Sequence, residues 1–165
     1  MRPNVYLVGM PGSGKSTVGP LVADRLGMAF VDLDDVIRRD TGRTIEAIYA
    51  EGGEEAFRDL EEAALADAVH TAGTVVGCGG GAVLRPANRE RLKAAGRVVW
   101  IRVPGEVADE RARRDPRGRP IVTMTDSLVP VAEARRPFYE EVATVTVDGT
   151  LPPGEVADAV AEAMA

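Results

Sequence analysis

The stretch with the clearest chemistry lies near the N-terminus, where glycines, a lysine and two hydroxyl residues stand at fixed spacing. Residues 9–17 read Gly-Met-Pro-Gly-Ser-Gly-Lys-Ser-Thr and match the phosphate-loop (P-loop) pattern G-x-x-x-x-G-K-[ST] at every required position. The glycines let backbone N–H groups turn toward phosphate oxygens, and the N-terminus of a following helix favours negative charge. Lys15 can reach the β- and γ-phosphates, and the Ser16 hydroxyl can ligate a Mg²⁺ that bridges them. The stretch therefore predicts a nucleoside triphosphate site. The residues predicted to bind ATP here are Pro11, Gly12, Ser13, Gly14, Lys15, Ser16 and Thr17.

The sequence on both sides of this loop predicts the elements that such a site needs. The apolar run at 5–8 predicts a buried strand, and the apolar residues at 18, 21, 22 and 26 fall on one face of a helix. A strand, a glycine loop and a helix in this order are the structural context of a nucleotide-binding P-loop, so the motif predicts a binding site here. A glycine-rich turn that binds nothing is the weaker alternative, because the full motif occurs in the right context.

The rest of the chain alternates strand and helix patterns. Further strands are predicted at 29–31, 74–78, 97–103 and 143–147. Helices are predicted at 35–41, 45–51, 54–71, 85–95, 105–114, 126–139 and 154–164, with an exposed loop at 115–125. This alternation predicts a single α/β domain over residues 1–165, with a five-stranded parallel sheet in a three-layer α/β/α arrangement. Ligands of such sheets gather at the carboxyl ends of the strands.

Composition and charge limit the function and the location. The 165 residues carry a formal net charge of −6, which argues against nucleic acid as a partner, since such binding surfaces are usually basic. Cys78 is the one cysteine, which rules out an internal disulfide and fits a reducing cytosol. Residues 1–4 lead directly into the first strand, and no run of 18 apolar residues exists. We therefore expect a cytoplasmic protein with no signal peptide and no membrane segment.

Two aspartates follow the predicted second strand. Asp32 and Asp34 are two residues apart at the edge where the phosphate loop is expected. One would serve Mg²⁺ through water, and the other would accept the proton of a substrate hydroxyl. Aspartates are also common in turns and at helix N-termini, which is the structural alternative. The neighbouring phosphate loop favours the functional interpretation.

Arginines and a triple glycine form a second set of candidates. Arg58 and Glu61 fall on one helical face, where Arg58 would hold a substrate carboxylate and Glu61 would fix its rotamer. From spacing alone, a solvated surface pair is the favoured interpretation. The glycines at 79–81 predict either close approach of a ligand or positive φ angles. Arg119 stands in the predicted loop as an arginine finger or a solvated residue, and Arg135 lies near a predicted helix end, where arginine is favourable anyway.

Taken together, these residues resemble one family. The motifs that carry the resemblance are residues 9–17, Asp32-Leu33-Asp34, Phe57-Arg58 with Glu61, Gly79-Gly80-Gly81, Arg119-Pro120 and Arg135-x-Pro137-x-Tyr139. In this order and spacing, over residues 4–148, the chain resembles the shikimate kinases. The resemblance implies a P-loop NTPase fold of the nucleoside-monophosphate-kinase type. It also implies a substrate-binding segment at about 33–61 and a lid at about 112–124.

The resemblance further implies an activity and a role for each matched residue. The implied activity transfers a phosphoryl group from ATP to the 3-hydroxyl of shikimate, in chorismate and aromatic amino-acid biosynthesis, by a monomer that uses Mg²⁺. The implied catalytic residues are Lys15, Asp34 and Arg119, and the implied metal-binding residues are Ser16 and, through water, Asp32. The implied substrate-binding residues are Asp34, Arg58, Gly79, Gly80, Gly81 and Arg135. Arg114, by stacking on adenine, and Arg119 are the remaining implied ATP-binding residues.

The sequence departs from the family pattern in two places. Residues 115–118 have an unusual spacing before the Arg-Pro pair, and residues 148–153 lack a basic residue that many members place near adenine.

Other functions are compatible with the same fold. A gluconate-type or nucleotide kinase is the alternative enzyme, and two arginines with a triple glycine favour shikimate over it. A nucleotide-dependent switch is a different class, but the guanine-reading N-K-x-D motif is missing.

Overall fold

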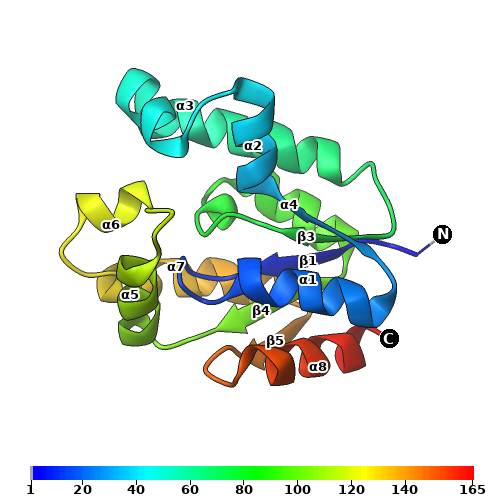
Figure 1. The fold of residues 1–165 in the computed structure, drawn as a ribbon. Helices are drawn as coiled ribbons and strands as arrows, with labels where there is room; N and C mark the ends of the chain where they lie inside the picture. The colour runs from blue at the N-terminus through cyan, green and yellow to red at the C-terminus, as the bar shows by residue number, and fades with distance from the viewer. Residues whose placement is uncertain (1) are drawn as a thin grey trace.

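The structure is a computed structural model that describes residues 2–165. Its centre is a parallel sheet of five strands in the order β2-β3-β1-β4-β5, which confirms the predicted fold class (Figure 1). The strands are β1 (Val5–Val8), β2 (Ala29–Asp32), β3 (Thr74–Gly77), β4 (Val98–Arg102) and β5 (Val145–Asp148). The helices are α1 (Lys15–Leu26), α2 (Leu33–Thr41), α3 (Ile45–Ala68), α4 (Pro86–Ala95), α5 (Gly105–Arg114), α6 (Pro120–Met124), α7 (Val129–Val142) and α8 (Pro153–Met164), with a short 3₁₀ turn η1 (Ala82–Leu84).

Two apolar cores lie on opposite faces of the sheet, as the alternation of side chains along β1 shows. Val5 and Leu7 face the core formed with α1 and α8, whereas Tyr6 and Val8 face the core formed with α4 and α7. Every residue of β1 is buried, as expected for the central strand of a sheet covered on both faces. Packing in these two cores fixes the positions of the strands, and therefore the positions at which the loops leave the strand ends.

The register of the sheet brings three loops to one edge. Leu7 of β1 lies opposite Gly77 of β3, and Gly77 lies opposite Asp32 of β2. The phosphate loop, the start of α2 and residues 79–81 therefore leave the sheet at the same level, beside its central strand. This is the carboxyl edge at which ligands of open parallel sheets bind.

Helix α6 differs from the sequence predictions for a local reason. The segment 115–125 was expected as a loop, but it contains helix α6, which begins at Pro120, a residue suited to a first helical position. The division expected between the helices at 45–51 and 54–71 is confirmed, because α3 consists of two helical segments that meet at a kink at Gly53, with φ 75° and ψ −174°. No helix within residues 2–165 combines the length and the apolar character that crossing a membrane requires.

Candidate active site

The phosphate loop, residues 9–17, has the backbone that its glycines predict. Gly9, Gly12 and Gly14 have φ angles of 152°, 83° and 102°, a region that strains other residues. A Cβ atom on Gly12 would also lie 2.3 Å from a main-chain oxygen of α5. Helix α1 begins at Lys15 without a capping side chain, so no side chain occupies the N–H groups of its first turn. The loop is therefore shaped to receive an anion.

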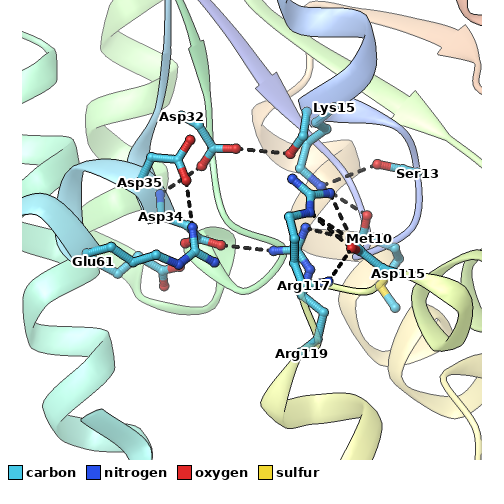
Figure 2. Close-up of polar contacts among 12 residues, drawn as sticks. Met10, Ser13, Lys15, Asp32, Asp34, Asp35, Glu61, Asp115, Arg117 and Arg119 are labelled. Atoms are coloured by element: carbon cyan, nitrogen blue, oxygen red, sulfur yellow. Dashed lines mark hydrogen bonds and ion pairs between the residues drawn. The ribbon is translucent and has the colours of Figure 1, made fainter. Parts of the chain in front are cut away.

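The ammonium group of Lys15 lies within this loop (Figure 2). Its Nζ atom donates to Gly9 O at 2.6 Å, to Met10 O at 3.0 Å and to Ser13 Oγ at 3.3 Å. Burial lowers the pKa of Lys15 to about 8, and the charge of Arg119 acts in the same direction. The loop thus holds a partly desolvated cation whose partners are neutral oxygens, and a phosphate oxygen would be a stronger acceptor.

Ser16 and Asp32 meet beside the loop. Ser16 Oγ donates to Asp32 Oδ2 at 3.0 Å, and Asp32 Oδ1 accepts the N–H of Asp34 at 2.9 Å as the N-cap of α2. Both residues line a cavity of about 350 Å³, here called the loop cavity, together with Gly12 and Lys15. Asp32 therefore combines the expected structural role, capping a helix, with a position beside the phosphate loop.

The oxygen atoms of this pair fit a magnesium ion that is completed by other ligands. Within residues 2–165, no three His, Cys, Asp or Glu side chains are grouped to hold a metal. A hydroxyl and one carboxylate would therefore need phosphate oxygens and waters to complete the coordination. Mg²⁺ in nucleotide sites is commonly held in this way, by one or two protein ligands, phosphates and water.

Asp34 lies where the loop cavity meets a second cavity. Its side chain is buried, and burial raises its pKa, with the negative charge of Asp32 adding to the effect and Arg119 opposing it. Arg119 Nη1 donates to Asp34 Oδ2 at 3.1 Å, whereas Asp34 Oδ1 has no partner within residues 2–165. A buried carboxylate with one free oxygen can accept a proton from a ligand hydroxyl.

The second cavity, here called the arginine cavity, contains two buried guanidinium groups. Its volume is about 50 Å³, and its lining includes Asp34, Arg58, Glu61, Gly80, Arg119 and Arg135. Arg58 on α3 is 8% exposed and Arg135 on α7 is 5% exposed. Arg58 Nη1 donates to Glu61 Oε1 at 2.8 Å, but Arg135 forms no ion pair with the residues that the structure describes. Arg58 also pairs with Glu54 at 3.4 Å, so Arg135 is the buried cation without an ion pair in the described residues, and it favours an anionic ligand.

Two interpretations based on local sequence are wrong at this cavity. Spacing alone favoured a solvated pair of Arg58 and Glu61, but both side chains are buried, and burial raises the pKa of Glu61 despite the opposing charge of Arg58. Arg135 was expected at a helix end, but α7 continues past Pro137 to Val142, so Arg135 lies within the helix on its buried side.

Residues 79–81, here called the glycine segment, are glycines because of close packing. None of the three has a positive φ angle. A Cβ on Gly79 would lie 2.5 Å from Glu61 Oε2, one on Gly80 would lie 2.5 Å from Pro11 Cδ, and one on Gly81 would lie 2.4 Å from the guanidinium nitrogens of Arg58. Positive φ angles are therefore not the reason for these glycines. The structure shows close approach by side chains of the site, and close approach of a ligand stays a prediction.

The predicted lid, residues 112–124, lies against both cavities. Arg119 precedes α6, and its guanidinium pairs with Asp34 at 3.1 Å and with Asp115 at 3.7 Å. Gly118, Pro120 and Ile121 also line the arginine cavity. The lid therefore narrows this cavity and places its arginine against Oδ2 of Asp34, which leaves Oδ1 free (Figure 2).

Two arginines of α5, Arg111 and Arg114, have different surroundings, and the sequence does not predict this difference. Arg114 lines the loop cavity, but its side chain is 78% exposed and pairs with Glu110 at 2.9 Å. Arg111, which the sequence analysis missed, donates from Nη1 to Gly149 O at 2.9 Å and lines the loop cavity and a further hollow beside Thr17. The only sequence signal for Arg111 is its position one helical turn before Arg114.

Such a fold and site define a class of protein, the P-loop kinases: a glycine loop with its lysine, a hydroxyl beside a carboxylate, a buried acidic residue and a lid arginine meet at one sheet edge. The family model described as shikimate kinase matches residues 11–165. A shikimate kinase of Symbiobacterium thermophilum is 44% identical over 148 residues, covering 87% of this chain and 85% of the relative. The chain belongs to the shikimate kinase family.

Solved structures agree with this membership. A shikimate kinase from Acinetobacter baumannii in complex with shikimate has a TM-score of 0.90 and 35% identity, covering 99% of this chain and 93% of that chain. A gluconokinase from Sinorhizobium meliloti has a TM-score of 0.59 and 20% identity, covering 99% of this chain and 93% of that chain. The second likeness shows a shared fold alone, so the gluconate-type alternative is not favoured.

Proposed function

We propose that this protein transfers the γ-phosphoryl group of ATP to the 3-hydroxyl of shikimate. The observation that carries the proposal is the junction of the two cavities. The residues that line both are Pro11, Asp34, Gly79, Gly80 and Arg119. A phosphate donor in the loop cavity and an anionic acceptor in the arginine cavity would meet at this wall, beside the free oxygen of Asp34. Membership of the shikimate kinase family names the acceptor that such a cavity would take.

Arg58 and Arg135 are proposed to hold the acceptor carboxylate. They approach from different helices, and Glu61 neutralises only Arg58. A guanidinium presents two parallel N–H donors to a carboxylate, a geometry that an ammonium group cannot reproduce. The main chain of the glycine segment would form one wall for the acceptor ring. The substrate-binding segment, residues 33–61, would supply Asp34 and Arg58.

Asp34 is proposed as the base. The acceptor hydroxyl would lose its proton to Asp34 Oδ1 as its oxygen forms a bond to the γ-phosphorus, and the bond from that phosphorus to the β–γ bridging oxygen would break, releasing ADP. Arg119 would leave Asp34 to balance the charge of the transferring group, as an arginine finger supplied by the lid. The lid would also exclude water, which favours transfer over hydrolysis.

On the donor side, the main chain at 11–14, Lys15 and Thr17 are proposed to bind the phosphates. Ser16, with Asp32 through water, is proposed to hold Mg²⁺, whose chemistry when bound is to neutralise phosphate charge. For the adenine, the placement of Arg111 against Gly149 supports Arg111 as a contact alongside the sequence-based candidate Arg114.

A cytoplasmic location and a monomeric state are proposed from the environment of Cys78 and from the exposed apolar side chains. Cys78 is buried, and its pKa is raised to about 12 by burial, so it is neither a disulfide partner nor a reactive thiol, in keeping with a cytoplasmic enzyme. Among residues 2–165, the exposed large hydrophobic side chains are Met124 and Leu151, which form no broad apolar patch. This supports a monomer.

An assay of ADP release tests the proposal directly. Shikimate, gluconate and nucleoside monophosphates are compared side by side with the wild-type protein and the Lys15→Ala variant. We expect turnover with shikimate that Lys15→Ala abolishes. Faster turnover with gluconate or a nucleotide, or none with shikimate, would contradict the acceptor assignment.

A further inference from the structure

Tyr139 lies behind the glycine segment, outside the arginine cavity, and its hydroxyl contacts that segment directly. The side chain is buried, and the hydroxyl donates to Gly80 O at 2.6 Å. The ring stacks on Trp100 with centroids 5.6 Å apart, which fixes its orientation. Burial raises the pKa of Tyr139 to about 12, against the opposing charge of Arg135. The hydroxyl is therefore a protonated donor at neutral pH.

The hydrogen bond to Gly80 O determines where the next N–H points. In a planar trans peptide, the C=O of Gly80 and the N–H of Gly81 point in opposite directions. Because the C=O faces Tyr139, the N–H of Gly81 faces away from it, and Gly80 and Gly81 line the arginine cavity whereas Tyr139 does not. Neither Gly80 N–H nor Gly81 N–H has an acceptor in the described part of the chain. Two donors at this wall therefore remain available for a ligand.

The same hydrogen bond connects the two arginines. Gly81 packs against the guanidinium of Arg58, close enough that a Cβ would lie 2.4 Å from its nitrogens. Arg135 lies four residues before Tyr139 on α7, so the two side chains share one face of that helix. The bond from Tyr139 to Gly80 therefore links α7, which carries Arg135, to the wall on which Arg58 rests.

We propose that Tyr139 is a positioning residue: its hydroxyl holds the Gly80–Gly81 peptide so that the Gly81 N–H donates to the acceptor carboxylate between Arg58 and Arg135. The inference deepens the proposed function and rests on it. Tyr139 does not touch the acceptor, and its effect is on acceptor binding rather than on ATP. The Tyr139 hydroxyl also lies 3.6 Å from Met10 Sδ, and Gly80 packs against Pro11, but the conformation of the phosphate loop is determined by its own glycines.

The test compares Tyr139→Phe with Tyr6→Phe. Each change removes one buried hydroxyl from the same apolar core, and within residues 2–165 the Tyr6 hydroxyl hydrogen-bonds only with Asn4, away from the site. Tyr139→Phe keeps the ring stack and is expected to weaken shikimate binding about tenfold, the weight of one hydrogen bond to a charged group. ATP binding should stay within about twofold. Tyr6→Phe should leave both affinities within about twofold while losing similar thermal stability.

The outcomes separate this inference from the proposed function. Wild-type turnover of shikimate is measured first, and its absence would remove the proposed function. If the wild type is active but Tyr139→Phe binds shikimate within twofold of wild type, only the role of Tyr139 is wrong. Equal weakening of ATP and shikimate would also overturn it, because that result indicates a general structural role.

A second measurement does not depend on whether Tyr139→Phe folds. In the wild-type protein labelled with ¹⁵N, the Gly81 amide resonance should move when shikimate is added and should not move with cyclohexanol, which lacks the carboxylate. A Gly81 resonance that is unaffected by saturating shikimate would overturn the proposal.

Discussion

The two arginines of the arginine cavity should respond differently to the same substitution, because their neighbours differ. Arg58 Nη1 lies 2.8 Å from the buried carboxylate of Glu61, whereas Arg135 forms no ion pair within residues 2–165. Replacing Arg58 by Met leaves Glu61 as an unpaired buried charge. Replacing Arg135 by Met removes a buried charge that has no protein counter-ion, and retains most of the apolar stem.

The expected magnitudes follow from these environments. Breaking a buried pair by removing one partner costs about 3–5 kcal/mol. For a domain of this size, about 2–4 °C of Tm accompany each kcal/mol, so Arg58→Met should lower Tm by about 6–20 °C. Arg135→Met should change stability by less than about 1 kcal/mol, or about 4 °C. Both variants should lose about 2–4 kcal/mol of shikimate binding, roughly 30-fold to 1,000-fold in Kd.

Calorimetric unfolding and titrations with shikimate and with ATP measure the two effects separately. ATP affinity should stay near wild type in both variants, since neither arginine lines the loop cavity. The reasoning is refuted if Arg135→Met loses as much stability as Arg58→Met. It is equally refuted if either variant keeps shikimate affinity within about threefold of wild type, a loss under about 0.7 kcal/mol.

The pH dependence of the Arg58→Met deficit provides an independent check. Burial already raises the pKa of Glu61 above 4.5, and the loss of Arg58 should raise it further. The folded state then binds more protons than the unfolded state above pH 4.5, so stability falls as pH rises through the folded pKa. The Tm deficit should therefore shrink when the pH is lowered toward 4.5, and a deficit that grows on acidification would contradict this assignment.

Three further predictions concern the donor side and the base. Burial lowers the pKa of Lys15 to about 8, so ATP binding above pH 8 should take up a proton and should weaken as the pH rises. Calorimetry in two buffers measures this proton uptake, and Lys15→Ala should abolish it. Asp34→Asn should lower kcat at least about 100-fold. In the wild type, the acid limb of the kcat/KM profile should lie above pH 3.8, because burial raises the pKa of Asp34. Arg119→Ala should lower kcat more than it weakens ATP binding, measured by steady-state kinetics and titration, and a loss in ATP binding alone would oppose the arginine-finger role.

The parts of the site that the sequence predicts well are those determined by local backbone or by sheet topology. The phosphate loop needs positive φ at Gly9, Gly12 and Gly14, and only glycine supplies it cheaply, so the motif and its conformation coincide. Asp32 and Asp34 follow a strand whose end is aligned with β1 by the parallel register, which places them at the ligand-binding edge. Neither inference requires knowledge of side-chain packing.

The parts that the sequence predicts poorly depend on packing between distant segments. Charged residues spaced like Arg58 and Glu61 usually lie on a surface, and their burial depends on contact with Gly81, which is 23 residues further along the chain than Arg58. The placement of Arg111 likewise depends on a hydrogen bond to Gly149, 38 residues further along the chain. Sequence spacing within α5 offers no means of deciding which arginine faces the loop.

The glycine segment connects the phosphate loop with the arginine cavity by direct packing. Gly80 packs against Pro11 of the phosphate loop, and the adjoining Gly81 packs against Arg58 of the arginine cavity. At this point the wall between the two cavities is main chain without side chains, and a larger residue at Gly80 or Gly81 would push against one site or the other. Tyr139 holds this wall from behind through Gly80 O at 2.6 Å, and Asp34 stands at its open end. Because transfer depends on how precisely a donor and an acceptor are held, the close packing of Gly80 and Gly81 is the feature of this wall that substitution by a larger residue would disturb first.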